Sequence, residues 1–166
     1  MKNVFFYDYP IIGEIGISET GGAISRVGFR GNGKKDFNGF NIAETPLIKK
    51  AAAQLKEYFA GKRAEFDLPL DPAGTEFQRA VWRALQTIPF GETCSYGDIA
   101  LQIGNPKACR AVGMANNRNP IAIIIPCHRV IGRDGSLTGY GGGLDIKQYL
   151  LDLEMRKRRQ HVHNQP

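Results

Sequence analysis

The apolar pattern of this 166-residue chain changes its period at "DPAG", residues 71–74. Before this break, two alternating stretches flank Gly21 and Gly22, which predicts a β-hairpin with a two-residue turn. After the break, apolar residues recur with helical spacing. Because strand patterns dominate before the break and helical patterns dominate after it, we expect an α+β fold with a domain boundary at the turn-rich break.

The break predicts two domains followed by a tail. Residues 1–72 would form a small α/β roll that serves as a supporting domain, and residues 73–156 would form a mostly helical domain. Residues 157–166, which begin within the basic run "RKRR", would form a flexible basic tail.

In the first domain, sequence signals mark both the start and the end of one helix. In "TPLIKKAAAQLKEYFAG", Thr45 is placed to cap the helix, Pro46 occupies its first turn, and Gly61 ends it. The stretch "AEFDLPL", residues 64–70, predicts one more strand before the break.

Three capped helices are predicted after the break. A capping box from Thr75 to Gln78 opens the first helix. Ser95 caps the second, and Asn105 caps the third with Pro106 in its first position. The second and third helices are short and joined by a tight turn, which is the spacing of a helix-turn-helix. An ordinary helical hairpin that binds nothing would show the same pattern.

Composition limits which classes of partner and which cellular compartment we expect. The net charge of +6 permits an anionic partner such as nucleic acid. No apolar run approaches the length of a membrane span, and the N-terminus lacks the apolar core of a signal peptide, so we expect a cytoplasmic protein without a membrane partner. Three cysteines without a CxxC pair indicate free thiols, and with three histidines in all we expect no metal site.

The strongest candidate for a catalytic residue follows an apolar run. Residues 121–125 are all isoleucine or alanine; they end at Pro126, and Cys127, His128 and Arg129 follow at once. A cysteine beside an imidazole can act as a nucleophile through its thiolate. A buried structural cysteine fits the same residues. For Arg129 we expect a structural ion pair.

Three further side chains stand out on the predicted helices. Glu154 on the last helix could orient His128, unless it is simply solvated. Arg110 could reach phosphates or a base stack, and Tyr96 could face a ligand; a surface charge and a packed ring are the plain alternatives. The glycine-rich loop, residues 132–143, would let a flat ligand approach the backbone closely.

Together, three stretches resemble a known family. "SYGDIA…GNPKACRAVG", "NPIAIIIPCHRVIG" and "GYGGGLDIKQYLLDLE" closely resemble the 6-O-alkylguanine-DNA alkyltransferases, or methylated-DNA–protein-cysteine methyltransferases, of the bacterial constitutive type. The resemblance is strong over residues 75–154 and loose over residues 1–70. It implies a ribonuclease H-like N-terminal domain and a C-terminal domain that contains the helix-turn-helix, binds DNA and holds an alkyl acceptor.

The resemblance implies DNA repair by direct reversal of damage. The protein would flip an alkylated guanine out of double-stranded DNA and move the alkyl group irreversibly onto Cys127, once per chain, with 4-O-alkylthymine as a second substrate. His128 would take the thiol proton through a water, and Glu154 would orient His128. Asn119 would brace the turn that carries these groups. Tyr96 would donate a proton or a hydrogen bond to the departing guanine.

The resemblance also implies a DNA surface and a base pocket. Arg110 would fill the gap left by the flipped base. The DNA contacts would come from Ser95, Tyr96, Asn105, Lys107 and Arg110. The guanine pocket would be walled by Met114, Val130, Tyr140 and Gly141. We expect a monomer that needs no cofactor.

Two departures from the family pattern are visible. Gly141 stands where some members carry a serine, and the first half lacks the cysteine and histidine set that binds zinc in some relatives. Two other functions stay open, namely a module that binds alkylated DNA without repairing it and a Cys-His hydrolase of small esters or amides. Relatives that bind without repair replace the acceptor cysteine, which is present here as Cys127.

Overall fold

The computed structural model describes residues 1–30 and 37–163. Its contacts divide the chain into two compact units. Unit 1 contains Met1–Ala73 and Pro120–Ile124, and unit 2 contains Gly74–Asn119 and the chain from Ile125 onward. The first division falls beside the predicted break, whereas nothing in the sequence indicated that the five residues before Ile125 belong to unit 1.

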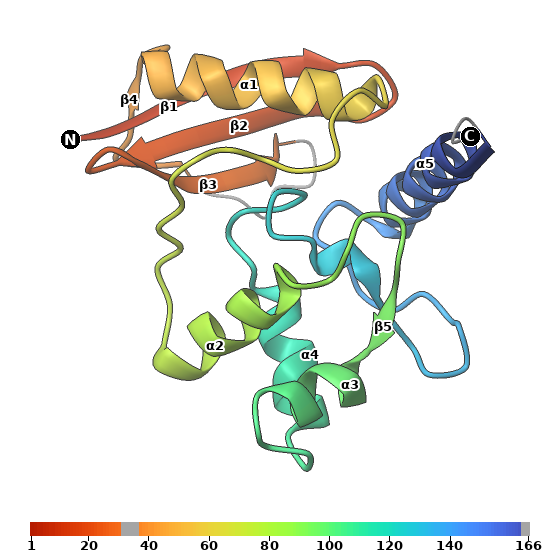
Figure 1. The fold of residues 1–166 in the computed structure, drawn as a ribbon. Helices are drawn as coiled ribbons and strands as arrows, with labels where there is room; N and C mark the ends of the chain where they lie inside the picture. Colours follow the sequence, from red (N-terminus) through yellow and green to blue (C-terminus); the bar gives the residue numbers. More distant parts are fainter. Residues whose placement is uncertain (31–36, 164–166) are drawn as a thin grey trace. The chain divides into compact units, whose positions relative to one another are not determined.

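Unit 1 is built on a four-stranded sheet in the order β3-β2-β1-β4, with β4 parallel to β1 and the other neighbours antiparallel (Figure 1). Its strands are β1 (Lys2–Tyr9), β2 (Gly13–Thr20), β3 (Ala23–Phe29) and β4 (Asn41–Ile42). Gly21 and Gly22 join β2 to β3 with φ angles of 61° and 83°. A two-residue hairpin turn requires such angles, so the predicted hairpin is confirmed.

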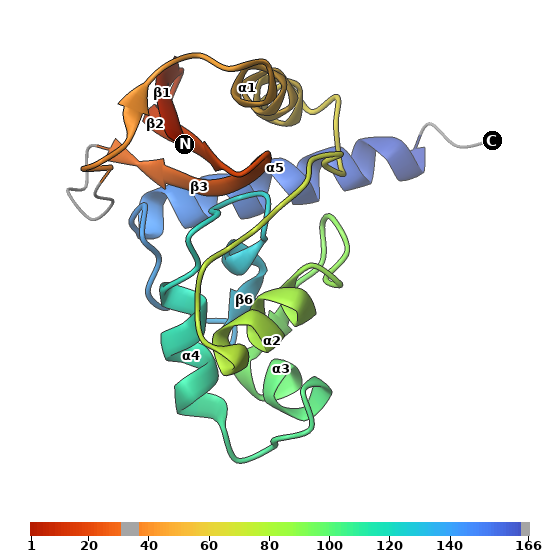
Figure 2. The ribbon, with the colours of Figure 1, turned by 90° about the vertical axis from the view of Figure 1, so that its left-hand side faces the viewer.

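Helix α1 (Pro46–Phe59) covers one face of this sheet, as both views show (Figures 1 and 2). Its start is as predicted, because the Thr45 hydroxyl oxygen accepts a hydrogen bond from the Ile48 amide at 3.2 Å. Gly61, with a φ of 74°, lies just past its end. The helix buries Ile48, Leu55 and Tyr58 completely, and these side chains form part of the core of unit 1.

Residues 64–70 do not form the predicted strand. A single bridge joins Leu70 to Ile24, and the Gln54 side chain does what a neighbouring strand would do. Its Oε1 accepts from the Asp67 amide at 3.0 Å, and its Nε2 donates to the Asp67 carbonyl at 3.2 Å. Pro69 has no amide hydrogen to offer a strand ladder. At Asp67 the backbone is therefore satisfied by a side-chain amide, and pairing with β3 among the described residues is limited to the bonds of Ile24 with Pro69 and Asp71.

Unit 2 gathers helices α2 (Glu76–Leu85), α3 (Tyr96–Gln102) and α4 (Cys109–Asn117) (Figure 1). The Trp82 indole of α2 donates to the Ala115 carbonyl of α4 at 2.9 Å. Capping boxes open α2 at Thr75 and α3 at Ser95, which confirms both predicted starts. α3 and α4 follow one another across a short turn, as in a helix-turn-helix.

Helix α4 begins later than predicted. Its N-terminal flanking residue is Ala108, which makes no side-chain cap, rather than Asn105. The Asn105 carbonyl instead accepts from the Ala108 amide at 3.0 Å. Residues 105–108 therefore close a separate turn, and the expected helical position of Pro106 is wrong.

The remaining elements of unit 2 are two short paired strands, a 3-10 turn and the C-terminal helix. They are β5 (Cys94–Ser95), the 3-10 turn η2 (Cys127–Arg129), β6 (Val130–Ile131), which pairs in parallel with β5, and α5 (Leu144–His163). The tail expected from residue 157 is helical as far as His163, because α5 continues through the basic run. Residues 164–166 of that expected tail lie outside the described residues.

The apolar run before Cys127 is anchored in unit 1. The Val27 amide of β3 donates to the Pro120 carbonyl at 2.9 Å, and the Val27 carbonyl accepts from the Ala122 amide at 3.0 Å. Ile123 is buried with a φ of 73°. A positive φ at a β-branched residue costs about 1–3 kcal/mol, so this turn is maintained by its surroundings. Across the two described stretches, no helix has the length and hydropathy of a membrane span.

Candidate active site

Cys127 is held by its backbone at the start of η2. Its amide donates to the Ile125 carbonyl at 2.8 Å, and its carbonyl accepts from the Asn116 side chain at 3.4 Å. The Asn119 side chain donates to the same Ile125 carbonyl at 2.8 Å. Cys127 is in no disulfide, and the residue is only 6% exposed. Asn119 thus braces the turn that presents the thiol.

His128 and Arg129, the two residues after Cys127, form a buried network with Glu154. His128 Nε2 lies 2.6 Å from one oxygen of Glu154. Arg129 donates hydrogen bonds to both oxygens of the same carboxylate, from Nε at 2.8 Å and from Nη2 at 3.1 Å. Its remaining Nη1 donates to the Ile88 carbonyl at 2.6 Å. The ion pair expected for Arg129 is confirmed, and its partner is the carboxylate that also holds His128.

The surroundings set the charge state of this network. Burial lowers the pKa of His128, and the cations Arg129 and Lys147 lower it further, against the attraction of Glu154. Burial alone would raise the pKa of Glu154, but the charges and hydrogen bonds of His128 and Arg129 outweigh it and hold that pKa well below its ordinary value. The network therefore contains a carboxylate that Arg129 neutralises and an imidazole that is neutral at pH 7.

The second ring nitrogen of His128 is the group available for proton transfer. Nε2 faces Glu154, whereas Nδ1 is buried and has no hydrogen-bond partner among the described residues. A carboxylate on Nε2 favours the tautomer with its proton there, which leaves a lone pair on Nδ1. His128 can thus accept a proton at Nδ1 while Glu154 holds the ring.

Lys147 is a site residue that the sequence reasoning missed. Its side chain is fully buried, and Nζ donates to the Val130 carbonyl at 2.7 Å and to the Thr138 carbonyl at 2.8 Å. Burial lowers the pKa of Lys147, while the charge of Cys127 raises it. A helical signal was present, because Lys147 precedes Glu154 by two turns and so shares its face of α5. An ammonium group near Cys127 favours the thiolate.

Two tyrosines expected at the site occupy different environments. Tyr140 is buried, and its pKa is raised well above its ordinary value by burial and then by the charges of Cys127 and Glu154. Tyr96 opens α3, with its ring beside Gly113 of α4 and its hydroxyl hydrogen-bonded to the Thr138 hydroxyl.

The remaining residues predicted for the pocket differ in burial. Val130 is fully buried, Gly141 is half-buried, and Met114 is 61% exposed on α4. The Val130 carbonyl accepts a hydrogen bond from Lys147, whereas the Met114 side chain lies on the exposed side of α4. Met114 stays a predicted pocket residue.

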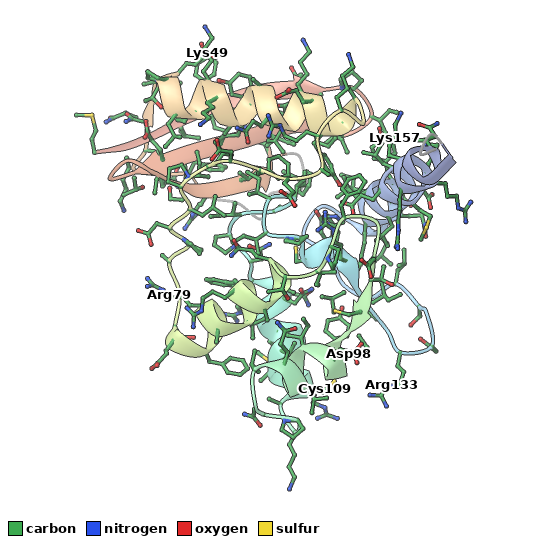
Figure 3. All side chains as sticks on the ribbon, viewed as in Figure 1. Lys49, Arg79, Asp98, Cys109, Arg133 and Lys157 are labelled. Carbon is green, nitrogen blue, oxygen red and sulfur yellow. The ribbon has the colours of Figure 1, made fainter. Side chains whose placement is uncertain are left out.

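The predicted DNA-contacting residues lie on and around the helix-turn-helix. Asn105, Lys107 and Arg110 are exposed on the turn and on the first residues of α4. Ser95 is engaged in the cap of α3, since its hydroxyl accepts from the Asp98 amide at 3.1 Å. Hydrogen bonds from Ser95, and then the charge of Arg133, lower the pKa of Asp98, which is labelled with Arg133 in Figure 3.

The other two cysteines lack such a network. Burial and then the charge of Asp98 raise the pKa of Cys94 to about 11, so its thiolate is scarce at pH 7. Cys109 is exposed at the first residue of α4 (Figure 3). Within residues 1–30 and 37–163, no group of three His, Cys, Asp or Glu side chains is arranged to hold a metal ion.

The fold and the site define a class of protein: a helix-turn-helix domain that carries one cysteine backed by a buried His–Glu pair. Family models match both halves of the chain. The 6-O-methylguanine DNA methyltransferase DNA binding domain matches residues 76–156, and the ribonuclease-like domain of the same methyltransferase matches residues 5–72. The chain belongs to the 6-O-methylguanine DNA methyltransferase family, as the resemblance predicted.

Curated relatives and solved structures agree with this assignment. The methylated-DNA–protein-cysteine methyltransferase of Methanosarcina acetivorans is 62% identical over 113 residues, which cover 68% of this chain and 72% of the relative. The O6-methylguanine methyltransferase of Mycobacterium tuberculosis is 46% identical with a TM-score of 0.85, covering 95% of this chain and 94% of that one. The M. tuberculosis protein in complex with DNA is 47% identical with a TM-score of 0.87, covering 93% and 94%.

Proposed function

We propose that this chain repairs double-stranded DNA by moving the alkyl group of 6-O-alkylguanine irreversibly onto Cys127. The observation that carries the proposal is the Cys127 turn, in which the next residue, His128, is buried and held by Glu154. The same chemistry would apply to 4-O-alkylthymine, because both lesions place the alkyl group on an oxygen of an aromatic ring. Transfer to cysteine is also the activity named for the relatives.

The transfer is a displacement at the alkyl carbon. The Cys127 sulfur forms a bond to that carbon, and the bond from the carbon to the guanine oxygen breaks with its electron pair remaining on guanine. His128 accepts the thiol proton at Nδ1 through a water, while Glu154 holds Nε2. Tyr96 offsets the charge on the departing guanine by donating a hydrogen bond or a proton.

The product explains why each chain reacts once. The transferred group ends in a thioether, which lacks the reactive bond of an acyl-enzyme, so water does not regenerate the thiol. No residue in the network offers a second nucleophile to remove the group. The reaction needs neither a metal nor a cofactor, because the thiolate and the activated leaving group supply the chemistry.

The helix-turn-helix would present the flipped base to the thiol. Extrusion of a base costs a few kcal/mol, and least for a weakly paired lesion. Arg110, exposed on α4, would enter the stack in place of the base. Lys107, Asn105 and Ser95 would contact the DNA backbone, where binding is independent of sequence. Tyr140, Val130, Gly141 and Met114 would surround the guanine.

The state of the protein follows from the same observations. We expect it to act as a monomer, since one chain contains every group that the transfer uses. A reducing compartment such as the cytoplasm would keep Cys94, Cys109 and Cys127 as thiols.

Intact-protein mass after incubation with a 6-O-methylguanine duplex tests the proposal. We expect one added methyl group per chain, located on Cys127 by peptide mass analysis. Tight binding of the lesion with an unmodified Cys127 would instead establish a non-repairing binding module. Repeated turnover of a small ester would establish a hydrolase.

A further inference from the structure

Thr138 lies in the glycine-rich loop between β6 and α5 and contacts a residue of the proposed reaction. Its hydroxyl is hydrogen-bonded to the hydroxyl of Tyr96, the first residue of α3. Thr138 itself is exposed, so this contact contributes little to the core. The proposed function does not use Thr138, although it requires the hydroxyl that Thr138 touches.

The backbone of Thr138 is fixed from another element. Its carbonyl accepts from Lys147 Nζ at 2.8 Å, and the same ammonium donates to the Val130 carbonyl at 2.7 Å. Lys147 is fully buried on α5, so it holds the loop at this residue. Thr138 is thus tied to α5 through its carbonyl and to α3 through its side-chain hydroxyl.

The hydrogen-bonding capacity of the two hydroxyls decides what this contact does. A phenol has one proton to donate and lone pairs to accept with, and a threonine hydroxyl can donate or accept. If Thr138 donates to the Tyr96 oxygen, the Tyr96 proton is directed elsewhere. A donor on the phenol oxygen also stabilises the negative charge that this oxygen gains when it gives up its proton.

We infer that Thr138 is a positioning residue that donates to the Tyr96 oxygen and so aims the Tyr96 proton at the departing guanine. The inference rests on the proposed function of Tyr96. During transfer, the carbon–oxygen bond of the lesion breaks and its electron pair stays on guanine. Tyr96 neutralises that charge with its proton, and the Thr138 hydrogen bond stabilises the oxygen left behind.

Single-turnover methyl transfer from a 6-O-methylguanine duplex, followed by intact mass, tests this role. Positioned proton donors contribute about 10²–10⁴-fold to a rate, so loss of the aiming bond in Thr138→Val should slow transfer about tenfold. Thr138→Ser keeps the hydroxyl and should restore the wild-type rate. In a Tyr96→Phe background, Thr138→Val should cause no further slowing, because the phenol oxygen is gone.

A matched control lies two residues away. The Ser136 hydroxyl donates to Asp134 at 2.6 Å within the same exposed loop, so Ser136→Ala removes a loop hydroxyl that does not touch Tyr96 and should leave the rate unchanged. The inference is overturned if Thr138→Val reacts at the wild-type rate, if it slows the Tyr96→Phe protein by the same factor, or if Ser136→Ala slows transfer equally. A wild-type chain that gains no methyl group would instead overturn the proposed function itself.

Discussion

The two units bury different kinds of polar side chain. Among the described residues, unit 1 buries Ser18 and Gln54, which are neutral and satisfied by neutral groups. The buried polar or charged side chains of unit 2 are Asn116, Asn119, His128, Arg129, Lys147 and Glu154. Burying ionised groups is costly even when they are paired. The folding of unit 2 therefore includes a desolvation cost that unit 1 avoids, and the groups that cause it include the residues next to Cys127, the proposed alkyl acceptor.

Ion pairs show the same contrast. In unit 1, Arg30 reaches Glu14 at 3.0 Å with both side chains partly exposed. In unit 2, Glu154 is 1% exposed and is shared by His128 and Arg129. Solvent screens the first pair but not the second. Removing a charge from the buried Glu154 network of unit 2 should thus affect both stability and chemistry, whereas removing a charge from the exposed pair of unit 1 should affect neither strongly.

The largest expected effect separates alkyl transfer from DNA binding. Cys127→Ala should abolish transfer, because it removes the only thiol backed by the His128–Glu154 pair, yet it should leave lesion binding intact. Intact mass and a binding titration with the methylated duplex measure the two properties. A methyl group found on Cys94 or Cys109 in this variant would show that the acceptor lies elsewhere.

The next effect compares the two ion pairs directly. Glu154→Gln leaves Arg129 buried without its counter-charge, which should lower the free energy of unfolding by about 3–5 kcal/mol and slow transfer. Glu14→Gln in unit 1 is the matched control and should cost less than about 1 kcal/mol. Urea denaturation followed by circular dichroism measures both. Equal losses for the two variants would remove the distinction between the units.

A smaller effect concerns pH. The unfolded chain binds a proton at His128 near its ordinary pKa of 6.5, whereas the folded chain, with a lowered pKa, binds it only at lower pH. Stability should therefore be fully present above 6.5 and fall as the pH drops toward the folded pKa. Glu154, also lowered, adds to the loss only below its ordinary value of 4.5. His128→Gln should flatten the slope of unfolding free energy between pH 6.5 and 5, and an unchanged slope would contradict this origin.

The smallest expected effect lies on the exposed face of unit 2. Arg110→Ala should change the unfolding free energy by less than about 0.5 kcal/mol, because the side chain is exposed. It should slow repair of duplex DNA more than reaction with the free alkylated base, since only the duplex needs a side chain in the vacated stack. Parallel rate measurements with the two substrates decide this, and equal slowing would exclude the base-displacing role.

Local signals in the sequence located most of the elements. Thr45, Thr75 and Ser95 each start a helix where predicted, because a cap depends on residues within one turn of it. Three predictions failed, and one of them is the start of α4, which follows a separate turn at residues 105–108. In the other two, Gln54 from α1 binds the backbone of Asp67 in the expected strand, and the basic run beyond residue 156 continues α5.

The sequence by itself determined the family and the capped starts of α1, α2 and α3, and it predicted Cys127, His128, Asn119 and Glu154 as site residues. Their motif is short and specific, and it can be recognised without coordinates. Only the tertiary structure decided that Arg129 grips both oxygens of Glu154, that Lys147 is buried beneath the loop, and that Thr138 meets Tyr96. These contacts join residues far apart in the chain. Burial and pairing across such separations depend on how the elements pack, and no local pattern encodes them.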